Sequence, residues 1–187
     1  MNYEIFFNNY RLYFAKIKQT TTVDVIKQII SYAQSKGLDN KNIAYILATA
    51  YHETAFDFIP KREFGNSAYF IKKYWTNSKV AKWLGNDSAE EAVKYCGRGL
   101  VQITGETNYE KFGIANDPEK ALEIDTAVRI LVDGMIQGSF TGKRLNLYIN
   151  SQTNDYIGAR RIINGNDKAY EIRDYTEKFY QILQKSI

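Results

Sequence analysis

The stretches Ala48-Thr-Ala-Tyr-His-Glu-Thr54 and Tyr95-Cys-Gly-Arg-Gly-Leu-Val-Gln-Ile-Thr-Gly-Glu-Thr-Asn-Tyr109 carry the strongest pattern in this chain. Before the first stretch ends, apolar residues recur at the spacing of one helical face: Ile43, Ile46, Leu47 and Ala50. The same face continues to Glu53. The pattern predicts a helix that begins at a cap formed by Asp39 or Asn40 and brings a lone carboxylate toward the core in its last turn.

The surroundings expected for Glu53 favour its protonated form. Partial burial disfavours a carboxylate, and the negative end of the helix dipole disfavours it again. A carboxyl group that stays protonated near neutral pH can act as a general acid. The alternative is a helix-terminal Glu that turns to solvent and has no such role.

The second stretch supplies groups that match a polar polymer. Gly97 and Gly99 let the backbone turn and come close to a ligand. The amides of Gln102 and Asn108 each donate and accept, which matches sugar hydroxyls and N-acetyl groups, and the hydroxyl of Thr104 can position a water. An acid beside such a strip suits the cleavage of a glycosidic bond. The alternatives are a structural glycine turn and solvated amides.

Composition indicates a globular protein with one core. The chain has 187 residues, of which 44% are hydrophobic and 14% aromatic, and we expect a single domain over residues 1–187. The net charge of +4 suits an anionic partner, but no block of basic residues indicates nucleic acid. No apolar run approaches the ~18 residues of a membrane span. Cys96 is the only cysteine, so no intramolecular disulfide forms, and we expect it to be a small buried residue.

Helical periodicity recurs along most of the chain. Expected helical segments are Phe6–Ile17, a second one begun by a capping box at Thr21 and Asp24, Ile43–Glu53, Tyr69–Leu84, a region opened by Asp117-Pro118, Ala127–Gly138, Tyr156–Ile163 and a last one from Asp167. Residues 97–104 predict a turn and a short apolar segment. The expected fold class is mainly α, with a small β element near 97–104.

Three separated motifs resemble those of the family 19 glycoside hydrolases, the chitinase-like branch of the lysozyme superfamily, and most of all its small phage and bacterial endolysins. They are His52-Glu53-Thr54, the strip Gly97-Arg98-Gly99-Leu-Val-Gln102-Ile-Thr104 with Asn108-Tyr109, and Arg161-Ile-Ile-Asn164-Gly165. The resemblance covers the chain from about Phe6 to the end. It implies a lysozyme-like domain that needs no cofactor or metal and hydrolyses β-1,4 bonds between amino sugars, with inversion.

The resemblance also assigns roles to single positions. It implies that Glu53 is the general acid and that Arg62-Glu63 matches the pair that supplies the second carboxylate in short members, so Glu63 is the expected base and Glu106 the fallback. Arg98 is expected to be a structural ion-pair partner. The remaining expected contacts with sugar or the attacking water are His52, Tyr95, Gln102, Thr104, Asn108 and Asn164.

The implied substrate is bacterial cell-wall peptidoglycan, and chitin is the alternative. Small size, the lack of disulfides and a basic surface favour peptidoglycan. We expect a monomer that is made in a host cytoplasm without a signal peptide and reaches the wall by another route. A glycan-binding domain without activity is the non-enzymatic alternative.

Two other lytic classes fit the sequence poorly. A zinc protease needs a second His four positions after His52, where Phe56 stands, and no other His exists in the chain. A Cys–His amidase would pair Cys96 with His52, and no orienting partner for that pair is evident.

Overall fold

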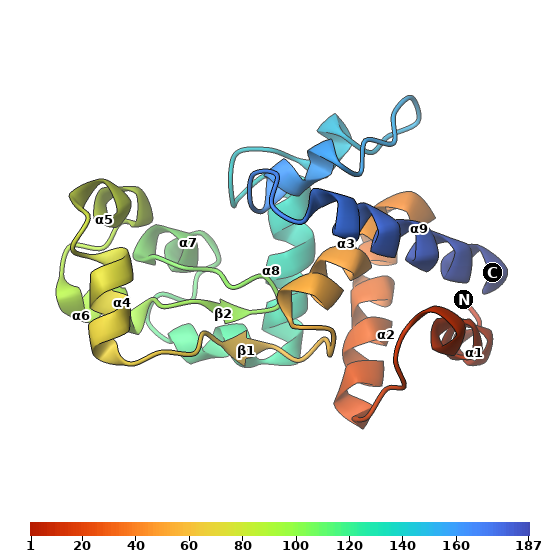
Figure 1. The fold of residues 1–187 in the computed structure, drawn as a ribbon, viewed down its shortest axis with the longest axis horizontal. Helices are drawn as coiled ribbons and strands as arrows, with labels where there is room; N and C mark the ends of the chain where they lie inside the picture. Colours follow the sequence, from red (N-terminus) through yellow and green to blue (C-terminus); the bar gives the residue numbers. More distant parts are fainter.

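The helix predicted to end at Glu53 lies at the centre of the structure. A computed structural model describes residues 1–187, and in it α3 (Asn40–Glu53) runs through the middle of the larger lobe (Figure 1). Every residue from Asn42 to Tyr51 is buried. Asp39 forms the cap, because its side chain accepts a hydrogen bond from the Asn42 amide at 3.0 Å. The helix is therefore covered by the fold on nearly all sides.

Four long helices build the larger lobe around α3. α9 (Ala169–Lys185) packs along α3 over most of its length, α1 (Tyr3–Tyr13) packs on α9, and α2 (Thr20–Ser35) packs on α8 (Ile124–Gln137). Both chain ends lie at this side of the molecule (Figure 1). The ring of Phe179 on α9 stacks on Phe14 with centroids 4.5 Å apart and also contacts Tyr51 and Phe58. Aromatic packing thus joins α9 to α3.

The smaller lobe is made of short elements at the opposite end (Figure 1). Its helices are α4 (Ser67–Tyr74), α5 (Ser78–Leu84), α6 (Ala89–Lys94) and α7 (Glu106–Lys111). Strand β1 (Lys61–Arg62) pairs antiparallel with β2 (Arg98–Gly99), with Lys61 opposite Gly99. Three 3-10 helices, η1 (Pro118–Leu122), η2 (Leu145–Leu147) and η3 (Gly158–Ile162), complete the chain.

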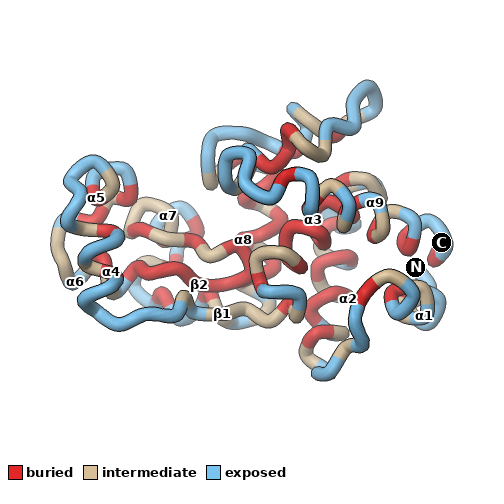
Figure 2. Tube along the Cα trace, viewed as in Figure 1, coloured by how far each residue is buried: buried red, intermediate tan, exposed pale blue.

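The buried residues form one large cluster that reaches both lobes and a small one inside the smaller lobe. Tyr95, Leu100 and Tyr109 of the smaller lobe belong to the large cluster, while Phe70, Tyr74 and Cys96 belong to the small one. Figure 2 shows the buried segments running along α3 and β2, with exposed segments outside. No helix in the structure has the length and apolar character required to cross a membrane.

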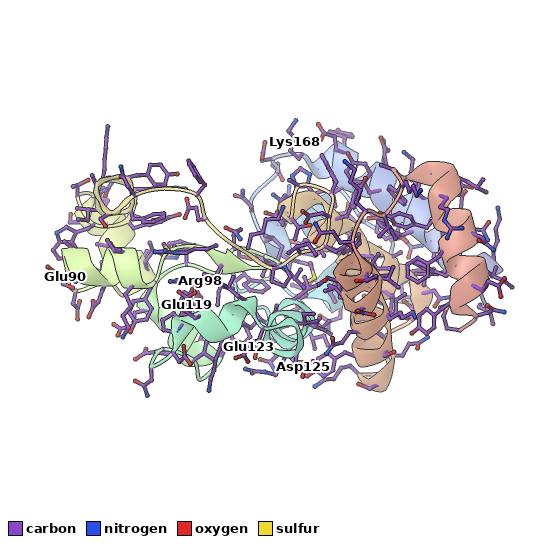
Figure 3. All side chains as sticks on the ribbon, turned by 90° about the horizontal axis from the view of Figure 1, so that it is seen from below. Glu90, Arg98, Glu119, Glu123, Asp125 and Lys168 are labelled. Atoms are coloured by element: carbon purple, nitrogen blue, oxygen red, sulfur yellow. The ribbon has the colours of Figure 1, made fainter.

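The buried Arg98 organises the turn that follows α6. Its guanidinium donates to Glu119 Oε1 at 2.7 Å and to the carbonyl oxygens of Lys94 and Cys96. Figure 3 shows Arg98 and Glu119 side by side. The prediction that Arg98 is a structural ion-pair partner is confirmed, and so is the burial of Cys96. Gly99 is required beside it, because its φ is +86° and an added Cβ would lie 2.9 Å from the Ala121 carbonyl oxygen.

The prediction of a mainly α fold with a small β element near residues 97–104 is confirmed. The bounds of several helices differ from those expected from the sequence. Gln19, without a side-chain hydrogen bond, precedes α2, so the capping box at Thr21 and Asp24 is wrong. The expected helix over 69–84 is two helices, because the Asn77 side chain caps α5. The helical regions expected after Asp117 and at 156–163 are 3-10 helices, and α6 and α7 were not predicted.

Replacing Phe179 with alanine is expected to destabilise the protein by about 3–5 kcal/mol, because the ring is fully buried and a cavity would remain between α9 and α3. Tyr170→Ala on the same helix is the control, since its ring is 66% exposed, and should cost less than about 1 kcal/mol. Urea unfolding followed by circular dichroism measures both. Equal losses of stability would contradict this account of the core.

Candidate active site

Glu53 ends α3 next to a buried cation. Its carboxylate oxygen Oε1 lies 2.5 Å from Nη1 of Arg160, which is on η3. The Arg160 side chain is 2% exposed and that of Glu53 is 18% exposed, so solvent reaches the acid but not its partner. Arg160 Nε donates to the Asp167 carbonyl oxygen at 2.8 Å. The sequence led us to expect a lone carboxyl group turned toward the core, whereas the structure pairs that group with a buried guanidinium.

Three polar side chains on α3 lie on the same helical face as Glu53. Tyr45, Thr49 and His52 follow each other at intervals of four and three residues, so they lie on one helical face with Glu53. The Tyr45 hydroxyl, the Thr49 hydroxyl and His52 Nδ1 are buried and have no hydrogen-bond partner in the protein. Buried polar atoms without partners are rare in folded proteins, and a catalytic role is one of the reasons for which they are kept. His52 directly precedes Glu53 at the end of the helix, and its ring lies 6.5 Å from that of Phe56.

The turn after Glu53 is strained. Ala55, Phe56 and Phe58 all have positive φ angles, between 54° and 76°, which residues other than glycine rarely adopt. Thr54 holds this turn, because its hydroxyl donates to the Ala50 carbonyl oxygen and accepts from the Phe58 amide, both at 2.8 Å. Backbone strain of this kind persists where the surroundings fix it, and such places cluster at active sites.

Glu63 is the other candidate carboxylate, and hydrogen-bond donors saturate it. Oε1 accepts from the Tyr69 hydroxyl at 3.1 Å and from Lys73 Nζ at 2.7 Å. Oε2 accepts from the Tyr74 hydroxyl at 2.7 Å and from the Gly97 amide at 3.3 Å. A carboxylate has about four lone-pair sites, so these donors fill them. Glu63 must therefore exchange a donor before it can accept a proton from water.

The pKa of Glu63 is lowered. Burial opposes its ionisation, but the hydrogen bonds from Lys73 and Tyr74, the charge of Lys73 and the Gly97 amide outweigh burial. Tyr74 stays protonated as a donor, because burial and the adjacent Glu63 raise its pKa to about 12. Glu63 is thus an anion at neutral pH. Gly97 must be small here, since an added Cβ would lie 3.1 Å from Glu63 Oε2.

A groove of about 220 Å³ collects three of the predicted residues. Gln102, Thr104 and Asn108 line it together with an apolar wall. Trp83 on α5, which is 69% exposed, and Phe140 in the loop after α8 belong to that wall. Aromatic faces beside amides and hydroxyls are suited to sugar rings, which are apolar on their faces and polar at their edges.

Hydrogen bonds within the protein fix the polar groups of this groove. Gln102 has a positive φ of 53°, and its Nε2 donates to the Lys61 carbonyl oxygen at 2.8 Å. Asn108 Nδ2 donates to the Thr104 carbonyl oxygen at 2.8 Å, and the Thr104 hydroxyl donates to the Gln102 carbonyl oxygen at 3.0 Å. No protein donor contacts Gln102 Oε1, so this oxygen is available to a ligand.

The predicted sugar contact Tyr95 does not line the groove. Its side chain is 2% exposed, and its hydroxyl donates to Glu106 Oε1 at 3.1 Å and accepts from Lys94. Tyr95 supports the smaller lobe instead, since hydroxyl and ring are both engaged there. Glu106, the fallback second carboxylate, is held by the same hydroxyl. Asn164 is exposed and follows Ile163, a lining residue of the groove.

Neither Glu53 nor Glu63 lines the groove, but residues close to each of them do. η3 carries Arg160, which holds Glu53, and the next residue after η3, Ile163, lines the groove. Tyr74 also lines the groove, and its hydroxyl donates to Glu63. The sequence analysis missed Arg160, Tyr74 and Lys73. The spacing of Tyr69 and Lys73, one helical turn apart, was a usable signal for the Glu63 cluster, whereas Glu53 and Arg160 are 107 positions apart.

Cys96 and His52 lie in different surroundings. Cys96 Sγ accepts from Arg62 Nε at 3.3 Å within the small buried cluster, while His52 is on α3. The structure therefore gives no support to a Cys–His pair. It contains no group of three or more His, Cys, Asp or Glu side chains placed to hold a metal ion.

Glu63→Gln is expected to lower the free energy of unfolding at pH 7 by about 1–3 kcal/mol, because charge-assisted hydrogen bonds are lost. Since the folded-state pKa lies below the ordinary value of 4.5, the stabilisation is complete above pH 4.5 and disappears as the pH falls through the folded-state pKa. Urea unfolding of both proteins from pH 7 to pH 3 measures the difference. Glu171→Gln, which breaks an exposed ion pair, is the control and should change little. A difference that stays constant down to pH 3 would contradict the assigned cluster.

Comparison with known protein families, with curated proteins and with solved structures found no match to this chain.

Proposed function

We propose that this chain is a glycoside hydrolase that cleaves β-1,4 bonds between the amino sugars of peptidoglycan. The observation that carries the proposal is the placement of Glu53: a partly exposed carboxyl group at a strained helix end, paired to a buried arginine and linked through η3 to an amide- and aromatic-lined groove. The resemblance of the three sequence motifs to family 19 glycoside hydrolases points the same way, and implies a lysozyme-like fold.

In the proposed reaction Glu53 protonates the leaving oxygen of the glycosidic bond. Loss of that proton leaves a carboxylate, and the adjacent guanidinium of Arg160 stabilises the charge that develops. Because Arg160 is buried and tied to the Asp167 carbonyl oxygen, it holds the carboxyl group in one orientation.

Glu63 is the proposed base, which takes a proton from the attacking water while Thr104 helps to hold that water. Because four donors already occupy its carboxylate, one of them must move away before Glu63 can accept that proton. Lys73 is the donor best suited to do so, because its side chain is 46% exposed whereas Tyr74 is buried. Substrate hydroxyls in the groove can replace the lost hydrogen bond. Charge on Glu63 at neutral pH supports a base role, and the four donors weaken its basicity.

Two alternative functions predict different experimental outcomes from the proposed one. A chitinase would use the same groups on a neutral polymer of N-acetylglucosamine. A glycan-binding domain would use the groove without the acid. The net charge of +4 favours peptidoglycan, whose peptides carry carboxylates.

Glu53→Gln should keep the fold and reduce the cleavage of purified sacculi by roughly 10²–10⁴-fold, because Gln cannot donate the catalytic proton. Glu177→Gln, an exposed position on α9, is the matched control and should retain full activity. Release of soluble reducing ends from sacculi measures the rate, with colloidal chitin as a parallel substrate. Wild-type rates in the Glu53 variant would disprove the acid assignment. Equal turnover of chitin would favour the chitinase, and no turnover of either polymer would favour a binding domain.

The first product is expected to be the α anomer, as an inverting mechanism requires when a β-linked chain is attacked by a water on the opposite face. Proton NMR of the products before mutarotation distinguishes the two anomers. An initial β product would exclude the mechanism in which Glu63 activates water.

A further inference from the structure

One edge of the groove is rich in unpaired positive charge. Residues 134–154, from the end of α8 to the strand-like segment after η2, contain no Asp or Glu, and their only charged side chains are Lys143 and Arg144. Lys111 at the end of α7 and Arg161 on η3 are the nearest additional cations. All four are exposed, and none forms an ion pair with an acidic side chain, whereas Arg160, next to Arg161, is buried and paired with Glu53.

Hydrogen bonds hold three segments together at this edge. The loop Gly138–Arg144 closes on itself through the Gly142 amide, which donates to the Gly138 carbonyl oxygen at 2.8 Å. The Thr141 hydroxyl ties the loop to η3 by donating to the Arg161 carbonyl oxygen at 2.6 Å. Lys111 Nζ donates to the Ser139 carbonyl oxygen at 3.0 Å, which ties α7 to the same loop. The four cations, here called the cationic edge, therefore come from three segments with fixed relative positions.

The cationic edge adjoins the groove directly. Lys111 Nζ lies 3.3 Å from Asn108 Oδ1, and Asn108 is a lining residue. Phe140 and Ile163 also line the groove, and they belong to the loop that carries Lys143 and to the segment that follows Arg161. A chain bound along Gln102 and Asn108 would thus present its substituents to these cations.

We propose that the cationic edge binds the carboxylates of the peptide stems of peptidoglycan, and so makes the enzyme prefer stem-bearing glycan to a neutral amino-sugar polymer. This inference rests on the proposed glycosidase function. A glycan strand carries its charge on the stems rather than on the sugar backbone, and unpaired cations that need no desolvation attract such carboxylates at little cost. Lys and Arg that stay exposed contribute modestly one by one, so a cluster is needed for a measurable preference.

The experiment compares one glycan with and without its peptides. The edge variant replaces Lys111, Lys143, Arg144 and Arg161 with Gln. A control variant replaces four exposed cations at the end of the molecule that holds the termini with Gln: Arg11, Lys16, Lys18 and Lys185. Both lose the same charge, so a general effect of net charge would appear in both. Substrates are glycan strands with intact stems and the same strands after an amidase has removed the stems.

The edge variant is expected to lower the ratio of kcat/KM on stem-bearing strands to that on stem-free strands by about tenfold, through KM, as several cooperating exposed ion pairs would give. The control variant should leave the ratio unchanged. Raising the salt to about 0.5 M should reduce the ratio of the wild-type protein as well, because exposed charges are screened. An unchanged ratio in the edge variant, or equal losses on both substrates, would overturn the proposal.

A binding measurement tests stem recognition independently of whether the protein is a glycosidase. Cosedimentation with sacculi in the Glu53→Gln background compares retention on stem-bearing and stem-free material. If the wild-type protein cleaves neither substrate, the glycosidase proposal fails, and loss of selective retention in the edge variant would still support stem binding. Equal retention of the edge and parent proteins would reject it. If the fourfold variant does not fold, Lys143→Gln with Arg144→Gln, both in one surface loop, takes its place.

Discussion

The buried guanidinium of Arg160 is the constraint on which the candidate site depends. A charged group that is 2% exposed is strongly unfavourable unless it is paired and hydrogen-bonded. Glu53 and the Asp167 carbonyl oxygen meet that requirement from two different segments. The end of α3, the 3-10 helix η3 and the segment before α9 must therefore come together in one arrangement. Removing either charge would leave the other buried or poorly compensated, which couples the position of the acid to the fold.

The smaller lobe also contains a buried arginine that is paired and hydrogen-bonded. Arg98 is 3% exposed and joins β2, the end of α6, Tyr109 on α7 and Glu119 on η1. Most of its partners are carbonyl and hydroxyl oxygens, so its main effect is to fix the backbone of a turn. Because that turn carries Gly97, whose amide binds Glu63, the geometry of the second carboxylate also depends on a buried cation. Two short strands alone would be too small to set this geometry.

Much of the fold follows from local pattern, and much of the site does not. The helices α3, α8 and α9 were predictable because each is long and buries a continuous apolar face. The six-residue helices α6 and α7 bury one residue each, so their sequences carry little periodicity. The grouping of Gln102, Thr104 and Asn108 was predictable because they share one strip. The burial of Tyr95 was not, because a Tyr beside a polar strip has the same local sequence whether it faces the groove or the core. The pairing of Glu53 with Arg160 depends on the tertiary fold alone.

The two candidate carboxylates differ in how many hydrogen-bond donors surround them. Glu53 accepts from a single protein donor and is reached by solvent. Glu63 accepts from four donors on α4 and the turn at Gly97, which keep it ionised. Different surroundings are a general way in which a site can assign separate roles to chemically identical groups. Among the donors to Glu63, Lys73 is the one that a bound ligand can displace most easily, because its side chain is exposed and has a flexible stem. Displacement of Lys73 would remove one of the four donors from Glu63 and leave the other three in place.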